Sequence, residues 1–252
     1  MDKTAVIPFI YQYCDRWCER CAFTDRCDVA LEEKRLTNGQ KDLSSAAYLV
    51  HVVNDFQNIM DLIIQNTPQM SLEDADEKQS AQTVPSKLIN SEEKAKIEAQ
   101  IEQLTHFIRV YSAQVKHWIQ VNDALLTRDK AQNLALADAL SVIEWYSFSM
   151  TSKVHRVTSL FFDPLSIPTD PIQNDRNGTA KLALVFVEKS LGAWESVRTI
   201  FPEMTDGLID IFLTLTHIKR DVQMLFPDAH KFKRPGFDDL ESEEIEIKNN
   251  SL

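Results

Sequence analysis

Glycine and proline are scarce in this chain, which has five glycines and nine prolines in 252 residues. Sandwiches and barrels join many short strands through turns rich in these residues, so their scarcity argues against such folds and favours long helices. Long apolar runs are also missing. The longest, residues 182–187, falls far short of the roughly 20 residues that a membrane-spanning helix needs, so we expect no membrane span.

The chain also lacks a secretory pattern and an excess of positive charge. Its first residues, MDKTAVIPFI, contain no cationic region followed by a long apolar segment and a small-residue cleavage site. We therefore expect a cytoplasmic protein whose cysteines are reduced. Lysine and arginine number 27 against 38 aspartates and glutamates, a net charge of −11. An acidic surface repels phosphate backbones, so nucleic acid is not an expected partner.

Cysteine is confined to one short segment near the N-terminus, with the spacing C-x3-C-x2-C-x5-C. Its members are Cys14, Cys18, Cys21 and Cys27. Core cysteines would be scattered, so this clustering indicates a shared ligand. The spacing is neither that of a zinc ribbon nor that of a bacterial ferredoxin, and it is compatible with either zinc or a 4Fe-4S cluster. Disulfides and unliganded redox-sensing thiols are the alternatives.

The first three cysteines would share one face of a helix if the segment were helical, because positions i, i+4 and i+7 nearly coincide at 3.6 residues per turn. Three thiolates on one face form a wide platform, which suits an iron-sulfur cube at least as well as a single zinc ion. Cys27 would return on the following loop as the fourth ligand. Four ligands predict a closed, coordinatively saturated site rather than an open catalytic one.

The eight residues Cys14–Cys21 resemble the three-cysteine motif of radical S-adenosylmethionine enzymes. In that family three cysteines hold a 4Fe-4S cluster and leave one iron open. An aromatic residue usually precedes the last cysteine of the motif, where this chain has Arg20. The family's barrel of alternating strands and helices is not predicted here, so we do not assign the chain to it.

Apolar residues recur with a helical period along most of the remaining chain. The pattern predicts five helices: 43–65, 91–126, a third that follows a break at 127–129 and ends at Phe162, 179–201 and 205–226. The third is expected to be the central helix, because Trp145 and Phe148 lie opposite its apolar stripe. Two connecting segments and a tail complete the expected organisation: a mobile loop at 66–90, a crossover loop at 163–178 and an acidic tail at 227–252.

The expected fold is therefore all-α, an up-and-down bundle of about five helices at residues 43–226. The four-cysteine metal or iron-sulfur segment and its link occupy residues 1–42. We expect a metal-binding helical protein in which this site has an electron-transfer or structural role. The alternatives are an interaction scaffold for an unidentified protein partner, with a zinc-stabilised N-terminus, and a cluster-dependent enzyme.

Other candidate sites are weaker. Two histidine–aspartate pairs at i, i+4 spacing predict surface ion pairs, His51 with Asp55 and His217 with Asp221. Glu144 and His155 share a stripe on the third predicted helix and form a candidate polar site. The sequence contains no Glu-x-x-His pair, glycine-rich phosphate loop or HExxH motif. No catalytic residue is therefore predicted.

Overall fold

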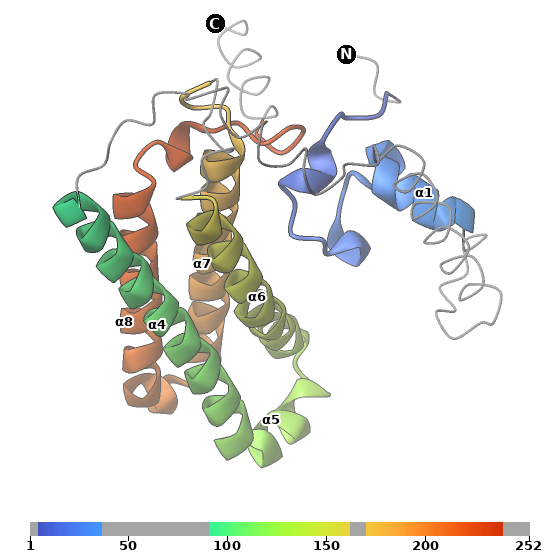
Figure 1. Cartoon of the computed structure of the whole chain (residues 1–252). Helices are drawn as coiled ribbons and strands as arrows, with labels where there is room; N and C mark the ends of the chain where they lie inside the picture. The colour runs from blue at the N-terminus through green and yellow to red at the C-terminus, as the bar shows by residue number, and fades with distance from the viewer. Residues whose placement is uncertain (1–4, 37–90, 162–169, 239–252) are drawn as a thin grey trace, which may run out of the picture. The chain divides into compact units, whose positions relative to one another are not determined.

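The structure, a computed structural model, describes residues 5–36, 91–161 and 170–238 (Figure 1). These residues form six α-helices and several 3₁₀ turns, without a β-strand, which confirms the prediction of an all-α protein. The predicted helix 43–65, the predicted loop 66–90 and the His51–Asp55 pair lie outside the described residues. The chain divides into an N-terminal unit, residues 1–11 and 16–89, and a helical unit, residues 12–15 and 90–252.

The helical unit contains four long helices and one short one. They are α4 (Ser91–Val121), the short α5 (Asp123–Lys130), α6 (Leu134–Ser159), α7 (Asp175–Ile200) and α8 (Thr205–Leu225). Helices α4 and α7 each pack against both α6 and α8, so the four long helices close a ring. Successive long helices run in opposite directions, which is the expected up-and-down arrangement (Figure 1).

Helix α7 is the central helix of the unit, and the prediction that the third predicted helix, α6, has this role was wrong. The buried residues of α7 lie on more than one face of the helix. Many of them are small, which allows the neighbouring helices to approach closely: Gly178, Ala180, Ala183, Ser190 and Ala193. Helix α6 buries fewer residues than α7, and its Phe148 is 83% exposed. The largest fully buried side chain is Trp194 of α7.

Side-chain caps explain where two helices begin. The side-chain oxygen of Asn133 accepts the N–H of Leu136 at the start of α6, and Asn174 accepts the N–H of Asn177 at the start of α7. Helix α7 therefore begins at Asp175 rather than at the predicted Thr179, and the crossover connection ends before it. The Asn-Gly pair that suggested a turn lies inside the first turn of this helix.

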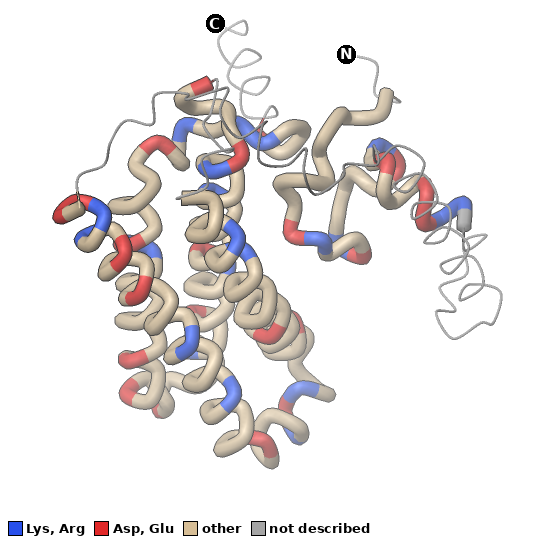
Figure 2. Tube along the Cα trace, viewed as in Figure 1, with Lys and Arg blue, Asp and Glu red and all other residues tan. Residues whose placement is uncertain are grey.

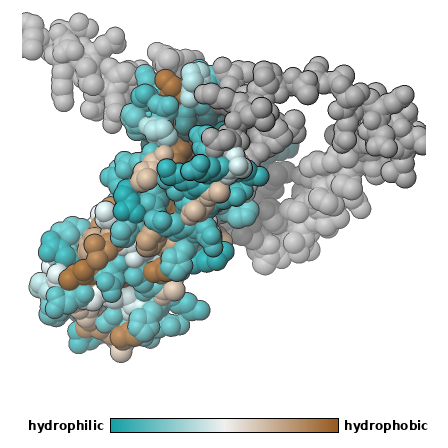
Figure 3. Space-filling view, turned by 60° about the vertical axis from the view of Figure 1, so that its left-hand side comes forward, coloured by the Kyte–Doolittle hydropathy of each residue, from teal (hydrophilic) through white to brown (hydrophobic). Residues whose placement is uncertain are grey.

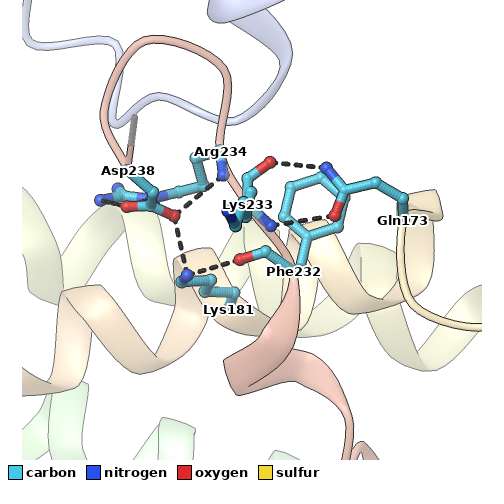
Figure 4. A network of polar contacts seen from close by, with 6 residues as sticks. All are labelled: Gln173, Lys181, Phe232, Lys233, Arg234 and Asp238. Carbon is cyan, nitrogen blue, oxygen red and sulfur yellow. Dashed lines mark hydrogen bonds and ion pairs between the residues drawn. The ribbon is translucent and has the colours of Figure 1, made fainter. Parts of the chain in front are cut away.

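The chain continues beyond α8 as a packed segment, residues 227–238, which we call the C-terminal strap. It contains the 3₁₀ turn η7 (Ala229–Lys231) and buries Phe232, which is 3% exposed. Lys181 of α7 donates to the Phe232 carbonyl and lies 2.7 Å from Asp238 Oδ2 (Figure 4). Arg234 binds the same carboxylate through its side chain and its backbone N–H. The acidic tail predicted from residue 227 thus starts as an ordered part of the helical unit.

The strap is expected to lose its ion-pair stabilisation in acid. Partial burial raises the pKa of the Asp238 carboxyl, but hydrogen bonds from Arg234 and Lys181 outweigh it, and the pKa lies below the ordinary value. A depressed carboxyl pKa stabilises the fold above the unfolded value, about 3.9, and that stabilisation disappears as pH falls through the folded pKa. The unfolding free energies of wild-type and Asp238→Asn, measured by urea titration, should therefore differ at neutral pH and converge below about pH 4. A difference as large at pH 2 as at pH 7 would contradict this.

The described part of the N-terminal unit is made of short elements. It contains the 3₁₀ turns η1 (Ile10–Gln12), η2 (Cys18–Arg20) and η3 (Thr24–Arg26), followed by α1 (Asp28–Leu36). The N–H of Ile7 donates to the Arg26 carbonyl, and Arg26 Nε donates to the Ala5 carbonyl, at 2.9 and 3.0 Å. Ile10 is the one buried hydrophobic residue among residues 5–36. Little apolar burial therefore holds this part of the chain together.

The surface of the helical unit is mixed in character. Acidic and basic residues are interspersed along its helices (Figure 2). Hydrophobic side chains on the face shown in Figure 3 form separate spots among hydrophilic ones. Within the described ranges, no helix is both long enough and apolar enough to cross a membrane.

The cysteine segment as a candidate metal centre

The four cysteines belong to different units of the structure. Cys14 lies in residues 12–15, which belong to the helical unit and which we call the anchored segment, whereas Cys18, Cys21 and Cys27 belong to the N-terminal unit. All four are thiols, and all are partly exposed.

The predicted helical platform for the first three cysteines is wrong. Arg16 has a φ of 60°, in the left-handed region, which no residue of a right-handed helix adopts. It interrupts the backbone between Cys14 and Cys18. The only helical turn within Cys14–Cys21 is the 3₁₀ turn η2, which begins at Cys18 itself.

Cys18 and Cys21 instead flank a tight turn. The N–H of Cys21 donates to the Cys18 carbonyl at 3.2 Å, and the N–H of Phe23 donates to Cys21 Sγ at 3.4 Å. Hydrogen bonds of this kind, from backbone amides to sulfur, stabilise thiolate ligands and tune iron-sulfur clusters. The guanidinium of Arg20 covers the ring of Trp17, 3.9 Å from its centroid. At this turn, Cys21 Sγ therefore already accepts a hydrogen bond from a backbone N–H.

Cys27 lies between the 3₁₀ turn η3 and the helix α1 that follows. It has an extended backbone after η3, and its carbonyl accepts the N–H of Leu31, the first hydrogen bond of α1. Cys27 therefore lies at the N-terminal boundary of α1, where its backbone is fixed by the helix.

Asp15, next to Cys14, is bound by two side chains of α6. Trp145 Nε1 donates to the Asp15 carbonyl at 3.1 Å, and the Tyr146 hydroxyl donates to Asp15 Oδ2 at 2.7 Å. Tyr146 is 4% exposed, so its hydroxyl has little freedom to move. Two hydrogen bonds, one to the backbone and one to the side chain, hold this residue on α6.

Tyr13, on the other side of Cys14, is held by α7 and the strap. Its ring packs on Phe232 with centroids 4.7 Å apart, and Gly178 leaves room for it. Its hydroxyl lies 3.5 Å from Asp175 Oδ1, and Asp175 also binds Arg156 at 2.9 Å. Burial raises the pKa of Tyr13, and the nearby Asp175 carboxylate raises it further, so the phenol stays protonated and can donate.

The cysteines fit the proposed ligands in chemistry but are not gathered into an assembled site. Thiolates are the usual donors for zinc and for iron-sulfur clusters. Among the residues that the structure describes, however, no three histidine, cysteine, aspartate or glutamate side chains are grouped so that they could hold a metal ion. The candidate centre therefore depends on the sequence spacing and on the contacts around individual cysteines.

Comparison with known proteins adds nothing to these observations. No protein family, curated protein or solved structure matches this chain. The function has to be inferred from the residues and contacts themselves.

The predicted surface pair of His217 and Asp221 was wrong. His217 stacks on the ring of Phe107, with centroids 4.8 Å apart and planes 5° from parallel. Asp221 is only 6% exposed and accepts hydrogen bonds from Gln103 of α4 and from its neighbour Arg220. Both residues therefore contribute to the packing of α8 on α4 and do not form a metal-binding pair.

The described residues of the helical unit line grooves at two helix pairs. The first, between α4 and α8, is lined by Gln100, Gln103, Arg220, Asp221 and Met224. The second, between α4 and α6, is lined by Ser112, Ser147, Phe148, Thr151, Ser152 and His155. His155 thus reaches a groove, but its predicted companion Glu144 does not line it. Cys14 lines neither groove, so neither supports a catalytic cleft beside this cysteine.

Proposed function

We propose that this protein binds a metal centre through Cys14, Cys18, Cys21 and Cys27, and that the centre stabilises the N-terminal part of the chain. The observation that carries the proposal is the scarcity of apolar burial around the cysteines. Ile10 is the one buried hydrophobic residue among residues 5–36, while four thiols lie within fourteen residues. Where a segment has too little core to fold alone, metal-binding free energy becomes folding free energy.

The surroundings of Cys14 support the same proposal. Tyr13 and Asp15 are both held by buried or partly buried partners of the helical unit. A ligand whose neighbours are already fixed loses less conformational entropy when it binds a metal ion. Cys14 is therefore suited to be the first ligand to engage the metal.

The proposal covers zinc and a 4Fe-4S cluster, because both take four thiolates. The backbone of Cys14–Cys21 does not form the helical platform that would favour the wider iron-sulfur cube. The tight turn between Cys18 and Cys21 suits a single tetrahedral ion at least as well. A zinc centre would be structural, whereas a cluster would add electron transfer, with the amide on Cys21 Sγ among the groups that set its potential.

Metal analysis of the full-length protein, purified without oxygen, tests the proposal. We expect either about one zinc per chain in a colourless solution, or about four irons with acid-labile sulfide and a broad brown absorbance. Serine at any one of the four cysteine positions should lower the metal content and make the N-terminal unit more sensitive to protease. The protease cleavage pattern, read by mass spectrometry, measures that loss of order.

A nearby acidic residue provides the control. Asp25 lies within the same segment, its side chain is 86% exposed, and its distance to Lys34 is 3.7 Å. Asp25→Asn should keep the wild-type metal content, because the carboxylate is not a proposed ligand. If the wild-type protein takes up neither zinc nor iron after reconstitution with each, or if all four serine variants retain full metal content, the proposal is wrong.

A further inference from the structure

The C-terminal strap is fastened to α7 at several points. Lys181 bridges the strap by contacting both the Phe232 carbonyl and the Asp238 carboxylate (Figure 4). The side chains of Lys181, Arg234 and Asp238 are 20%, 15% and 17% exposed, so their ion pairs are mostly shielded from water. Shielded pairs of this kind are screened less by salt than surface pairs are.

A second fastening lies beside the first. The Gln173 side chain donates to the Lys233 carbonyl at 2.7 Å and accepts the Lys233 N–H at 2.9 Å. A carboxamide that satisfies both backbone groups of one residue fixes the direction of the chain at that point. Phe232 takes part in the first fastening and directly precedes the second, so its backbone has a defined position.

Phe232 is the strap residue that contacts the anchored segment. Its ring packs on Tyr13, and both rings lie over Gly178, close enough that a Cβ atom there would be 2.7 Å from Tyr13 and 2.8 Å from Phe232. The Tyr13 ring is thus enclosed between the first turn of α7 and the strap. Removing the strap would remove one wall of this enclosure.

Cys14 is held from two sides by different parts of the helical unit. Trp145 and Tyr146 of α6 hold Asp15. The Tyr13 hydroxyl contacts Asp175, and its ring packs on Phe232. The Phe232 carbonyl accepts from Lys181, which also pairs with Asp238. The contacts therefore form a continuous path from Asp238, more than 200 residues away in the sequence, to the residue that precedes Cys14.

From this path we infer that the C-terminal strap positions the Cys14 thiol and so controls its availability as a metal ligand. The inference rests on the proposed function in taking Cys14 as a metal ligand, but the positioning of its thiol does not depend on any metal. With the strap fastened, Tyr13 and Asp15 fix the backbone on both sides of Cys14. With the strap released, Tyr13 loses the Phe232 side of its enclosure, and the backbone beside Cys14 becomes more mobile.

Alkylation of individual cysteines in the full-length, metal-free protein tests the inference. The protein is treated with iodoacetamide under reducing conditions in the presence of a chelator, and the labelling rate of each cysteine is followed by peptide mass spectrometry. In Lys181→Met and in Asp238→Asn, we expect the rate at Cys14 to rise severalfold while the rate at Cys27 stays at the wild-type value. Lys181→Arg, which keeps the positive charge, should restore most of the wild-type rate.

The control is an ion pair of α7 and α8 that does not contact the strap. Lys219 lies 3.3 Å from Glu188, and Lys219→Met should leave all four labelling rates unchanged. Circular dichroism checks that the helices remain folded. If Lys181→Met lowers the helical content, Asp238→Asn decides the question, because Asp238 lies outside every α-helix.

Two results would overturn the inference: an unchanged rate at Cys14 in Asp238→Asn, or an equal rise at Cys14 and Cys27, which would indicate general loosening. A parallel measurement of metal extraction by a chelator separates this inference from the proposed function. If the wild-type protein binds metal, extraction should be faster in the strap variants. If it binds none, the proposed function fails, while the labelling rates still confirm or overturn the positioning of Cys14.

Discussion

Replacing Gly178 by alanine is expected to displace Tyr13 from the helical unit while the four long helices stay folded. A Cβ atom at this position would overlap Tyr13 Cε1 and lie 2.7 Å from Tyr13 Cδ1 and 2.8 Å from Phe232 Cζ, closer than real Cβ atoms approach other heavy atoms. The backbone of α7 itself accepts alanine, which favours a helix by about 1 kcal/mol over glycine. The clash is therefore relieved by the rings, and the anchored segment moves.

Hydrogen exchange of the peptide that contains residues 12–16, followed by mass spectrometry, measures this displacement. We expect the amide hydrogens of this peptide to exchange much faster in Gly178→Ala than in the wild-type protein, because protection from exchange is lost where a segment detaches. The alkylation rate at Cys14 should rise with it. Far-ultraviolet circular dichroism should show no loss of helix.

The same helix contains a matched control. Gly192 also lies in α7, but a Cβ atom there would meet nothing within 4 Å. Gly192→Ala should raise the unfolding free energy by about 0.5–1 kcal/mol and leave the exchange of residues 12–16 unchanged. If residues 12–16 exchange their amide hydrogens at the same rate in both glycine variants, the close contact at Gly178 does not position Tyr13.

Replacing Trp194 by alanine is expected to destabilise the helical unit by about 3–5 kcal/mol, the usual cost of removing a large buried aromatic side chain. Trp194 is fully buried and packs edge-on against Trp118, with ring centroids 5.0 Å apart. Its Nε1 donates to the hydroxyl of Tyr111 at 3.2 Å, and burial raises the pKa of Tyr111, so that group stays neutral. Alanine would leave a cavity and a buried hydroxyl without this donor.

Urea unfolding followed by circular dichroism measures the loss. Trp194→Phe separates the contribution of ring packing from that of the hydrogen bond, because phenylalanine keeps much of the ring contact but has no N–H donor. Leaving a buried polar group unsatisfied costs about 1–3 kcal/mol. Phe148→Ala is the control, since Phe148 is 83% exposed and its removal should change stability by less than about 0.5 kcal/mol. If Trp194→Ala costs no more than Phe148→Ala, Trp194 is not part of the core.

Local patterns in the sequence were sufficient for the fold class and for most helix positions. Few glycines and prolines, together with a helical apolar period, predicted α4, α6, α7 and α8, because a helix buries side chains that recur every three to four residues. The error at the start of α7 was also local. Asn174 is a good capping residue four positions before Gly178, whereas the Asn177-Gly178 pair is typical of a turn.

The sequence by itself determined that the protein is helical and that its four thiols lie within one short segment, because residue periodicity and spacing are properties of neighbouring residues. Only the tertiary structure decided that α7 is central and that Tyr13 and Asp15 are anchored. The partners of Asp15 are 130 and 131 residues away, and Asp175 is 162 residues from Tyr13. Contacts over such separations depend on which helix faces meet, and no local pattern encodes that choice.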